Sequence, residues 1–276
     1  MSSKRHKYKV EFFYRPGKNL PRGDIATLQE ELRNIASNCF DECPNYQCLE
    51  DSRTALDDKV ITIAKNSEGK IVGFCSALLI PMEGLGEVLH LGLTCVDPIG
   101  RGHRLTHKLT SKLLTHYLLR YRPFGKVWVT NVACVLSSLG NVAKNFENVF
   151  PSPYYQAKPT VEQLKIAAAI DQHYRKHIAI NDDAEFCPHT FLFKGSVTDS
   201  VFEKEAEDTR YHHRDKELNQ FYLDLIKFDR GDEVLQIGTV SLATLLRYML
   251  RRTAPLNITA AAELKLAAGA AETRGF

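Results

Sequence analysis

The chain has 276 residues, of which 44% are hydrophobic and 25% charged, a composition typical of a globular protein with a substantial core. Its formal charge of +3 is too small to indicate a polyanionic partner without a local basic patch. The opening residues MSSKRHKYKV lack the apolar core of a signal peptide, and no apolar run is long enough to span a membrane. We therefore expect a cytoplasmic protein without a membrane partner.

In the first half of the chain, strand and helix patterns alternate. Short β-branched and aromatic runs indicate strands at 8–14, 59–64, 71–80, 87–96 and 126–131. Apolar residues at helical spacing indicate helices at 24–37, at 103–121 and at 137–148. Asn66 to Gly69 predicts the turn of a hairpin. This order predicts an α/β fold with a mixed sheet flanked by helices.

The second half has a weaker pattern. We expect helices at 161–178 and 218–226, strands at 190–194 and 233–240, and a charged loop at 197–214. Ser241 is placed to cap a further helix, and the alanine-rich end is either a marginal helix or a tail. We divide the chain into a core at 1–158 and a C-terminal part at 159–276 that completes the sheet and forms the acceptor site.

The seven cysteines indicate reduced thiols, because three of them lie in apolar stretches where a free cysteine behaves as a small hydrophobic residue. Another group could suggest zinc, but its spacing lacks a paired C-x-x-C motif. We therefore expect no metal. That group comprises Cys39, Cys43 and Cys48, with His189 or the pair His212 and His213.

The segment from Leu91 to Thr106 carries the most information about function. Its apolar strand ends at Asp97 and Pro98, and a glycine-bearing turn then opens a leucine-rich helix. The unpaired N–H groups at such a helix start converge at the positive end of the helix dipole, where they favour an anion. A diphosphate could therefore bind to backbone amides at this turn, although an ordinary strand-to-helix connection has the same pattern.

The run V-x-P-x-x-R-G before this helix, Val96 to Gly102, resembles the acetyl-CoA motif of the GNAT N-acetyltransferases. The family pattern has Gln or Arg, two residues, Gly, one residue, and then Gly or Ala. Arg101 takes the first position, but Arg104 and Thr106 stand where the family has small residues. The order of elements over residues 7–155 matches the family, so the resemblance implies a mostly antiparallel GNAT-like sheet with a C-terminal elaboration.

The resemblance implies acetyl-CoA as acyl donor, with its pantetheine arm paired along the motif strand like an added β-strand. A backbone N–H near Leu93 or Thr94 would then meet the thioester carbonyl. Asn131 could bind the pantetheine amides or simply end its strand. The cofactor-binding residues that the resemblance implies are Leu93, Thr94, Cys95, Val96, Arg101, Gly102, His103, Arg104, Leu105, Thr106 and Asn131.

Acyl transfer to an amine also needs proton transfer, because an amine with a pKa of about 10.4 is protonated at neutral pH. The resemblance places His90 where some family members have a general base, with a buried structural histidine as the alternative. Glu87 is a second candidate, on the opposite strand face from His90 unless a bulge intervenes. Tyr154 and Tyr155 are candidate acids for the departing thiolate, or packing residues.

Our main functional hypothesis is an enzyme that moves an acetyl group from acetyl-CoA to a primary amine, by direct attack in a ternary complex. The acceptor we favour is a small molecule, and the chain could form a homodimer. The replaced small residues motivate the alternative of a non-catalytic acyl-CoA-binding module. A nucleic-acid partner is the weakest hypothesis and would use the basic helix from Arg101 to Arg120.

Overall fold

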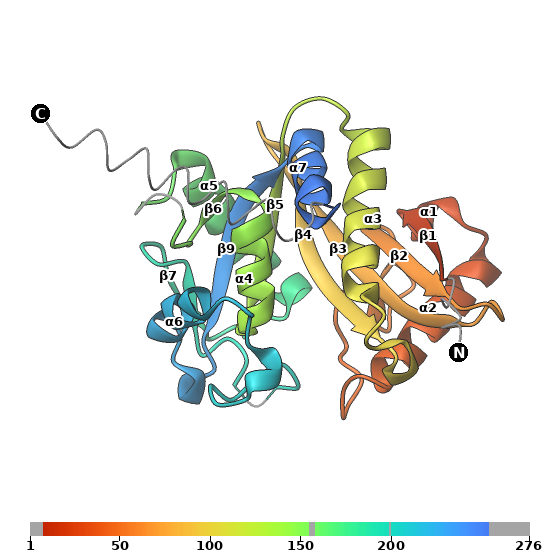
Figure 1. Ribbon diagram of the computed structural model, residues 1–276, viewed down its shortest axis with the longest axis horizontal. Coiled ribbons are helices and arrows are strands. Elements are labelled where there is room, and N and C mark those ends of the chain that lie inside the picture. The colour runs from red at the N-terminus through yellow and green to blue at the C-terminus, as the bar shows by residue number, and fades with distance from the viewer. Residues whose placement is uncertain (1–7, 155–157, 199, 254–276) are drawn as a thin grey trace, which may run out of the picture.

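The computed structural model describes residues 8–154, 158–198 and 200–253. Its strands are β1 Lys9–Tyr14, β2 Lys59–Lys65, β3 Ile71–Met82, β4 Gly86–Val96, β5 Val127–Ala133, β6 Glu147–Phe150, β7 Glu185–Cys187, β8 Leu192–Lys194 and β9 Glu233–Val240. They form one sheet in the order β1-β2-β3-β4-β5-β9-β8-β7, with β6 paired to β9 (Figure 1). All neighbouring strands run antiparallel except β4 and β5. The predicted mixed, mostly antiparallel sheet is confirmed.

Helices cover both faces of this sheet. They are α1 Pro16–Asn19, α2 Arg22–Ser37, α3 Leu105–Tyr121, α4 Leu136–Asn145, α5 Val161–Ala169, α6 Lys216–Leu225 and α7 Leu242–Thr253. Figure 1 shows α3, α4 and α7 in front of the sheet, while the apolar residues of α2 and α5 pack against the opposite face. Within the described ranges, no helix has both the length and the apolar character needed to cross a bilayer.

Helix α3 fixes the site because it begins at the turn that follows β4. Its buried side chains recur at helical spacing and pack against β2, β3 and β4. Burial of one leucine side chain stabilises the fold by about 1.5–3 kcal/mol, so this stripe holds the helix firmly on the sheet. The stripe consists of Leu105, Leu109, Leu113, Leu114, Tyr117 and Leu118.

Most predicted elements are present, and the differences have local causes. The predicted helix 137–148 ends at Asn145, because Asn148 takes a left-handed φ of 54° and the chain pairs with β9 as β6. Asparagine tolerates that conformation better than most residues. The predicted helix 161–178 turns into a π-helical segment at Ile170–Tyr174. Strand β7 was not predicted, since three residues are too few to show alternation.

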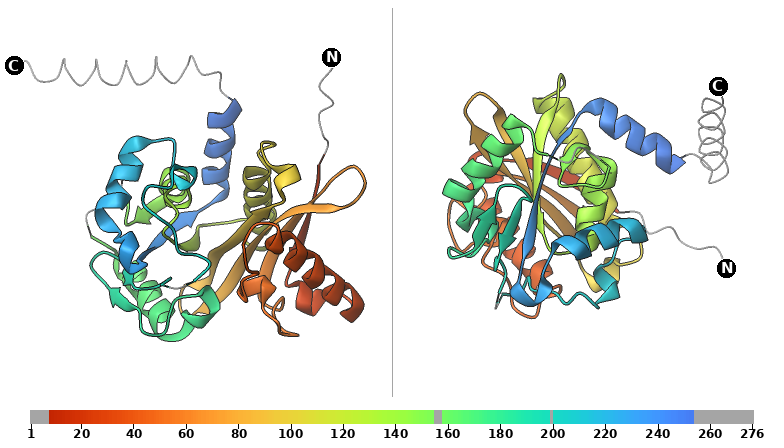
Figure 2. Two further views of the ribbon diagram at one scale, coloured as in Figure 1. Left: turned by 90° about the horizontal axis from the view of Figure 1, so that it is seen from below. Right: turned by 90° about the vertical axis from the view of Figure 1, so that its left-hand side faces the viewer.

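The C-terminal part supplies β7, β8 and β9 to the sheet. Every residue of β5 pairs with a residue of β9 (Figure 2), and every residue of β9 is buried. Ser241 caps α7 as predicted, accepting a 3.2 Å hydrogen bond from the Thr244 amide. The alanine-rich end lies outside the described residues.

The first residue of β9, Glu233, is a buried carboxyl group. It is 7% exposed and accepts a 2.7 Å hydrogen bond from the Ser196 hydroxyl. Burial raises its pKa to about 7 from an ordinary 4.5. A raised carboxyl pKa means that the folded state prefers the neutral acid, so stability falls as pH rises from 4.5 through 7.

We predict that Glu233→Gln stabilises the protein at pH 8 by about 3 kcal/mol, because the amide removes a buried charge and keeps an acceptor for Ser196. At pH 4, where both states protonate the wild-type acid, the two proteins should have equal stability. Urea unfolding at both pH values measures the difference. Equal stability at pH 8 would contradict the raised pKa.

Candidate functional site

Strands β4 and β5 pair over only three residues before they separate. The parallel register runs from Leu89 with Val129 to Leu91 with Asn131, and no described strand pairs with this edge of β4 beyond Leu91. Residues 88–90 are buried, whereas residues 91–94 are half-exposed. Figure 1 shows β4 and β9 far apart at this end of the sheet. The backbone of β4 is therefore accessible where β5 leaves it.

A β-bulge lies at the point of separation. On the other edge of β4, Cys75 pairs with Thr94 and Ala77 with Leu91, so Gly92 and Leu93 together face the single residue Ser76. A bulge bends its strand and increases the local twist. The bulge thus turns the free edge of β4 away from β5.

The turn after β4 is open to solvent. Asp97 holds the short η2 segment, Pro98–Gly100, by accepting a 2.9 Å hydrogen bond from the Ile99 amide. Gly102 has a φ of 79°, and no atom lies within 4 Å of a Cβ built there. Residues 101–104 and 106 are exposed, so within the described part of the chain no side chain covers this corner.

No family model matches the chain, and no curated protein matches it. Among solved structures, it is similar to an acyl-CoA N-acyltransferase from Pseudomonas aeruginosa (17% identity, 51% of this chain and 86% of that one, TM-score 0.38). It is also similar to the GNAT family N-acetyltransferase YhbS from Escherichia coli in complex with CoA (16%, 48% and 66%, 0.34). A third match covers 60% of this chain and 17% of a fungal multi-domain GH3 beta-N-acetylglucosaminidase with a GCN5-related glucosamine N-acetyltransferase region (14%, 0.31).

All three TM-scores lie below 0.5, so we base the fold type on this chain's own strand order, bulge and separated strands. The antiparallel β1 to β4, the parallel β5 and the motif turn before α3 occupy the positions that the sequence resemblance requires. The fold is of the GNAT type.

In this GNAT fold, Arg104 occupies the N-cap of α3 with a left-handed φ of 57°. That conformation costs a residue with a Cβ about 1–2 kcal/mol, which explains why the family motif favours a small residue here. Its backbone thus adopts a glycine-like conformation while its side chain is exposed. The amides of Leu105 and Thr106 belong to the first helical turn and have no acceptor within the helix.

The C-terminal end of α2 supports the turn from behind. Asn38 donates a 2.9 Å hydrogen bond to Asp97, and the Cys39 thiol lies 3.5 Å from the Val96 carbonyl oxygen. A hydrogen bond from Cys95, together with the Arg101 guanidinium, lowers the pKa of Cys39 to about 7. The Arg101 charge therefore lies beside α2 as well as beside the turn.

Two other basic side chains near the turn, His103 and Lys108, lie next to the N-terminal strand. The His103 and Tyr8 rings are 5.5 Å apart, and the Lys108 ammonium lies 5.7 Å from the centre of the Tyr8 ring. His103 Nδ1 also lies 3.0 Å from the Arg101 carbonyl oxygen. These contacts keep positive charge close to the open turn, where it would favour a bound anion.

The structure buries His90, the first candidate base, on the sheet face covered by α5. It is 1% exposed, and its Nδ1 shares a 2.9 Å hydrogen bond with the Thr130 hydroxyl of β5. Burial lowers its pKa to about 3 from 6.5. A neutral histidine with so low a pKa is a weak base, so the geometry favours the structural alternative for this residue.

The buried His90 should make stability depend on pH. A lowered histidine pKa means that only the unfolded state binds the proton between pH 6.5 and 3, so stability is lost as pH falls through that window. We predict a loss of about 2 kcal/mol from pH 7 to pH 5 attributable to this residue. His90→Gln should remove that part of the pH dependence in urea unfolding, and an unchanged slope would contradict the assignment.

Glu87, the second candidate base, lies on the opposite strand face as predicted, because the bulge comes after both residues. Its carboxylate accepts hydrogen bonds from Arg15 at 2.5 Å, Arg122 at 3.2 Å and the Tyr117 hydroxyl at 3.3 Å. The Arg15 and Arg122 guanidinium groups both form ion pairs with it. Glu87 therefore anchors α3 to the sheet in this structure, four residues before the strands separate.

Asn131 lies within β5, which continues to Ala133 rather than ending at Asn131 as expected. Its side chain donates a 3.1 Å hydrogen bond to Gln236 and lies 3.4 Å from the Ser138 hydroxyl. Gln236 in turn donates to Tyr222 at 2.6 Å. The side chain of Asn131 thus joins β5 to β9 and α6 instead of facing the free edge of β4.

The candidate acid Tyr154 lies away from the separated strands. Its hydroxyl donates a 3.2 Å hydrogen bond to Asp215, which also pairs with Lys144 in the last turn of α4. Helix α4 starts just after β5, close to where β4 and β5 separate. Its last turn, with Lys144, lies about 14 Å along the helix axis from its first turn and thus away from the separated strands. Tyr155 lies outside the described residues.

The remaining predicted residues follow the strand alternation. Leu93 contacts the two apolar clusters on the α2 and α5 face, and Cys95 is buried against α2. Val96 packs towards α3, and the Thr94 hydroxyl is hydrogen-bonded to Cys75, beside the Thr110 side chain of α3. In the part of the chain that the structure describes, no three His, Cys, Asp or Glu side chains gather as a metal site.

Proposed function

We propose that this protein transfers an acetyl group from acetyl-CoA to a primary amine. The observation that carries the proposal is the free, half-exposed edge of β4 beside an open turn at the start of α3. The edge offers backbone groups to the amides of a pantetheine arm, as an added strand would receive them. The turn offers amides to the diphosphate.

In this reaction the acceptor ammonium first releases one proton to solvent. The amine nitrogen then attacks the thioester carbon, the C–S bond breaks, and the second proton lost by the nitrogen passes to the departing thiolate. A backbone N–H near Leu93 or Thr94 would stabilise the negative charge that develops on the carbonyl oxygen. Because His90 and Glu87 are both bonded to neighbours, we do not assign either of them as the base. Overall, one proton leaves the site to solvent for each acetyl group transferred to an ammonium.

We propose a small, cationic amine as the acceptor. An open hollow of about 1030 Å³ lies between residues 203–211 and residues 223–229, and five carboxylates but three cations line it. Phe202, which precedes this segment, is tied to the end of β5 by a 3.5 Å contact from the Cys134 thiol to its carbonyl oxygen. A net negative hollow beside the end of β5 would attract a protonated amine.

A second candidate function is a non-catalytic module that binds acyl-CoA. Two observations favour it. His90 and Glu87 are both engaged in hydrogen bonds with neighbouring side chains, and an exposed arginine, Arg104, stands at a position where the family has a small residue. Calorimetry with acetyl-CoA and CoA, followed by thiol release with a panel of amines, separates the two functions. Tight binding without turnover supports the module, and thiol release with any amine supports the enzyme.

We predict that Gly102→Pro weakens acetyl-CoA binding at least about tenfold, because proline fixes φ near −65° and removes an N–H from the turn. Gly125→Pro is the matched control, since Gly125 has a similar φ of 84° and open space but lies at the other end of α3. Isothermal calorimetry measures both. Equal affinities in the two variants would contradict the turn as the diphosphate site.

A further inference from the structure

Gln47 is a buried polar residue in a strained conformation. It is 0% exposed and has a φ of 50°, in the left-handed region that disfavours a residue with a Cβ. Strain of this kind persists only where surrounding contacts enforce it, and it is concentrated at functional sites. No motif in the sequence singles out this glutamine, so only the fold reveals it.

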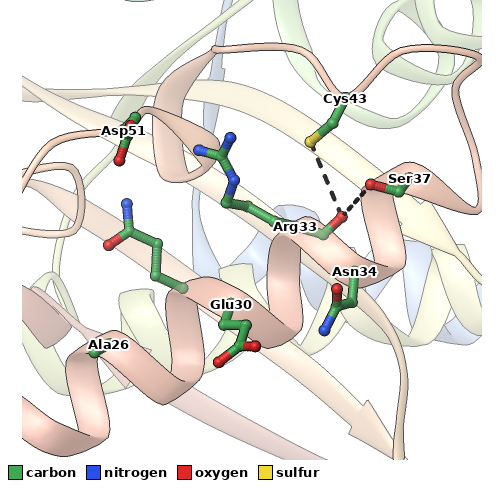
Figure 3. Close-up of a pocket in the computed structure, with 8 residues that line it drawn as sticks. Ala26, Glu30, Arg33, Asn34, Ser37, Cys43 and Asp51 are labelled. Atoms are coloured by element: carbon green, nitrogen blue, oxygen red, sulfur yellow. Dashed lines mark hydrogen bonds between the residues drawn. The ribbon is translucent and has the colours of Figure 1, made fainter.

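Helix α2 holds the backbone around Gln47 in place. The short η1 segment, Gln47–Leu49, lies in a loop whose carbonyl groups accept hydrogen bonds from polar side chains of α2. Arg33 donates a 2.7 Å hydrogen bond to the Leu49 carbonyl, and Gln29 donates a 2.5 Å bond to that of Glu50. Figure 3 shows Arg33 extending from α2 towards this loop, with the Ser37 hydroxyl and the Cys43 thiol both directed at the Arg33 carbonyl oxygen.

The side-chain amide of Gln47 lies against the β4 bulge. Its Nε2 donates a 2.9 Å hydrogen bond to the Tyr46 hydroxyl, and its Oε1 accepts a 3.3 Å bond from Ser76. A Cβ added to Gly92 would lie 1.8 Å from that Oε1, and its three nearest heavy atoms would all belong to Gln47. Ser76 is the residue opposite the bulge, so one amide group contacts both strands there.

We propose that Gln47 is the positioning residue of the acyl site: its amide fixes the bulge at Gly92 and Leu93 and thereby aims the free edge of β4 at the thioester. This inference rests on the proposed function. Gln47 touches no reacting atom and acts through the bulge. An apolar side chain of equal length could fill the space but would leave Ser76 and Tyr46, both buried, without these partners.

The test compares two ligands that differ only in the pantetheine arm. Acetyl-CoA needs both the turn and the free edge of β4, whereas 3′-phosphoadenosine 5′-diphosphate needs only the turn. Gln47→Met should weaken acetyl-CoA binding about tenfold and leave the affinity for the nucleotide unchanged. Gln47→Asn, which keeps the amide on a shorter chain, should recover part of the loss.

A second pair of variants tests the contact itself. Gly92→Ala should lower the melting temperature and the acetyl-CoA affinity, because the new Cβ meets the Gln47 amide. Adding Gln47→Ala should raise the melting temperature again, since it removes the three nearest atoms, but should leave acetyl-CoA affinity low, because the amide that fixes the bulge is still missing. Gly23→Ala is the control, because a Cβ there meets no atom within 4 Å.

The outcomes distinguish this inference from the proposed function. If wild-type protein binds neither acetyl-CoA nor the nucleotide, the proposed function fails, and the melting temperatures still report on the Gln47 to Gly92 contact. If wild-type protein binds acetyl-CoA but Gln47→Met weakens both ligands equally, Gln47 is a general structural residue and the inference is overturned. A Gly92→Ala protein with wild-type affinity and melting temperature would also overturn it.

Discussion

The separation of β4 from β5 at Leu91 is the constraint on which the rest of the candidate site depends. A strand inside a sheet has its backbone groups bonded on both sides, and none remains for a ligand. Here β3 pairs with one edge of β4 along the whole strand up to Val96, while β5 pairs with the other edge over only three residues. The bulge makes this possible without breaking the sheet, because β3 follows β4 through a single shift in register.

Buried polar groups hold the two parts of the sheet, on either side of the separation between β4 and β5, in position. On the β5 side, the side chains of Asn131, Gln236 and Tyr222 form a continuous hydrogen-bonded network. On the β4 side, Gln47 joins Ser76 to Tyr46. Such networks specify a unique geometry when every member is satisfied, and no buried side-chain nitrogen or oxygen in the described residues lacks a partner.

The sequence predicted the sheet and the turn because their signals are local. Apolar and β-branched runs mark β2 to β4, leucine spacing marks α3, and the Pro and Gly residues mark the turn between them. It could not predict the chemical state of the candidate residues. His90 looks like any histidine on a strand, and only the fold shows that it is buried and bonded to Thr130 of β5. Gln47 and Glu233 lack a sequence signal altogether, since burial of a polar side chain depends on elements distant in the chain.

Strand β9 lies beside β5, yet about a hundred residues separate them in the chain, as in the pairing of Asn131 with Gln236. Contacts between such distant residues form slowly, because the intervening loop must close first. During synthesis, the motif strand and its helix leave the ribosome well before the partner that supports β5. A nascent chain that stops short of residue 234 therefore leaves this edge of β5 without its partner strand, and an unpaired strand edge is a template for pairing with other chains.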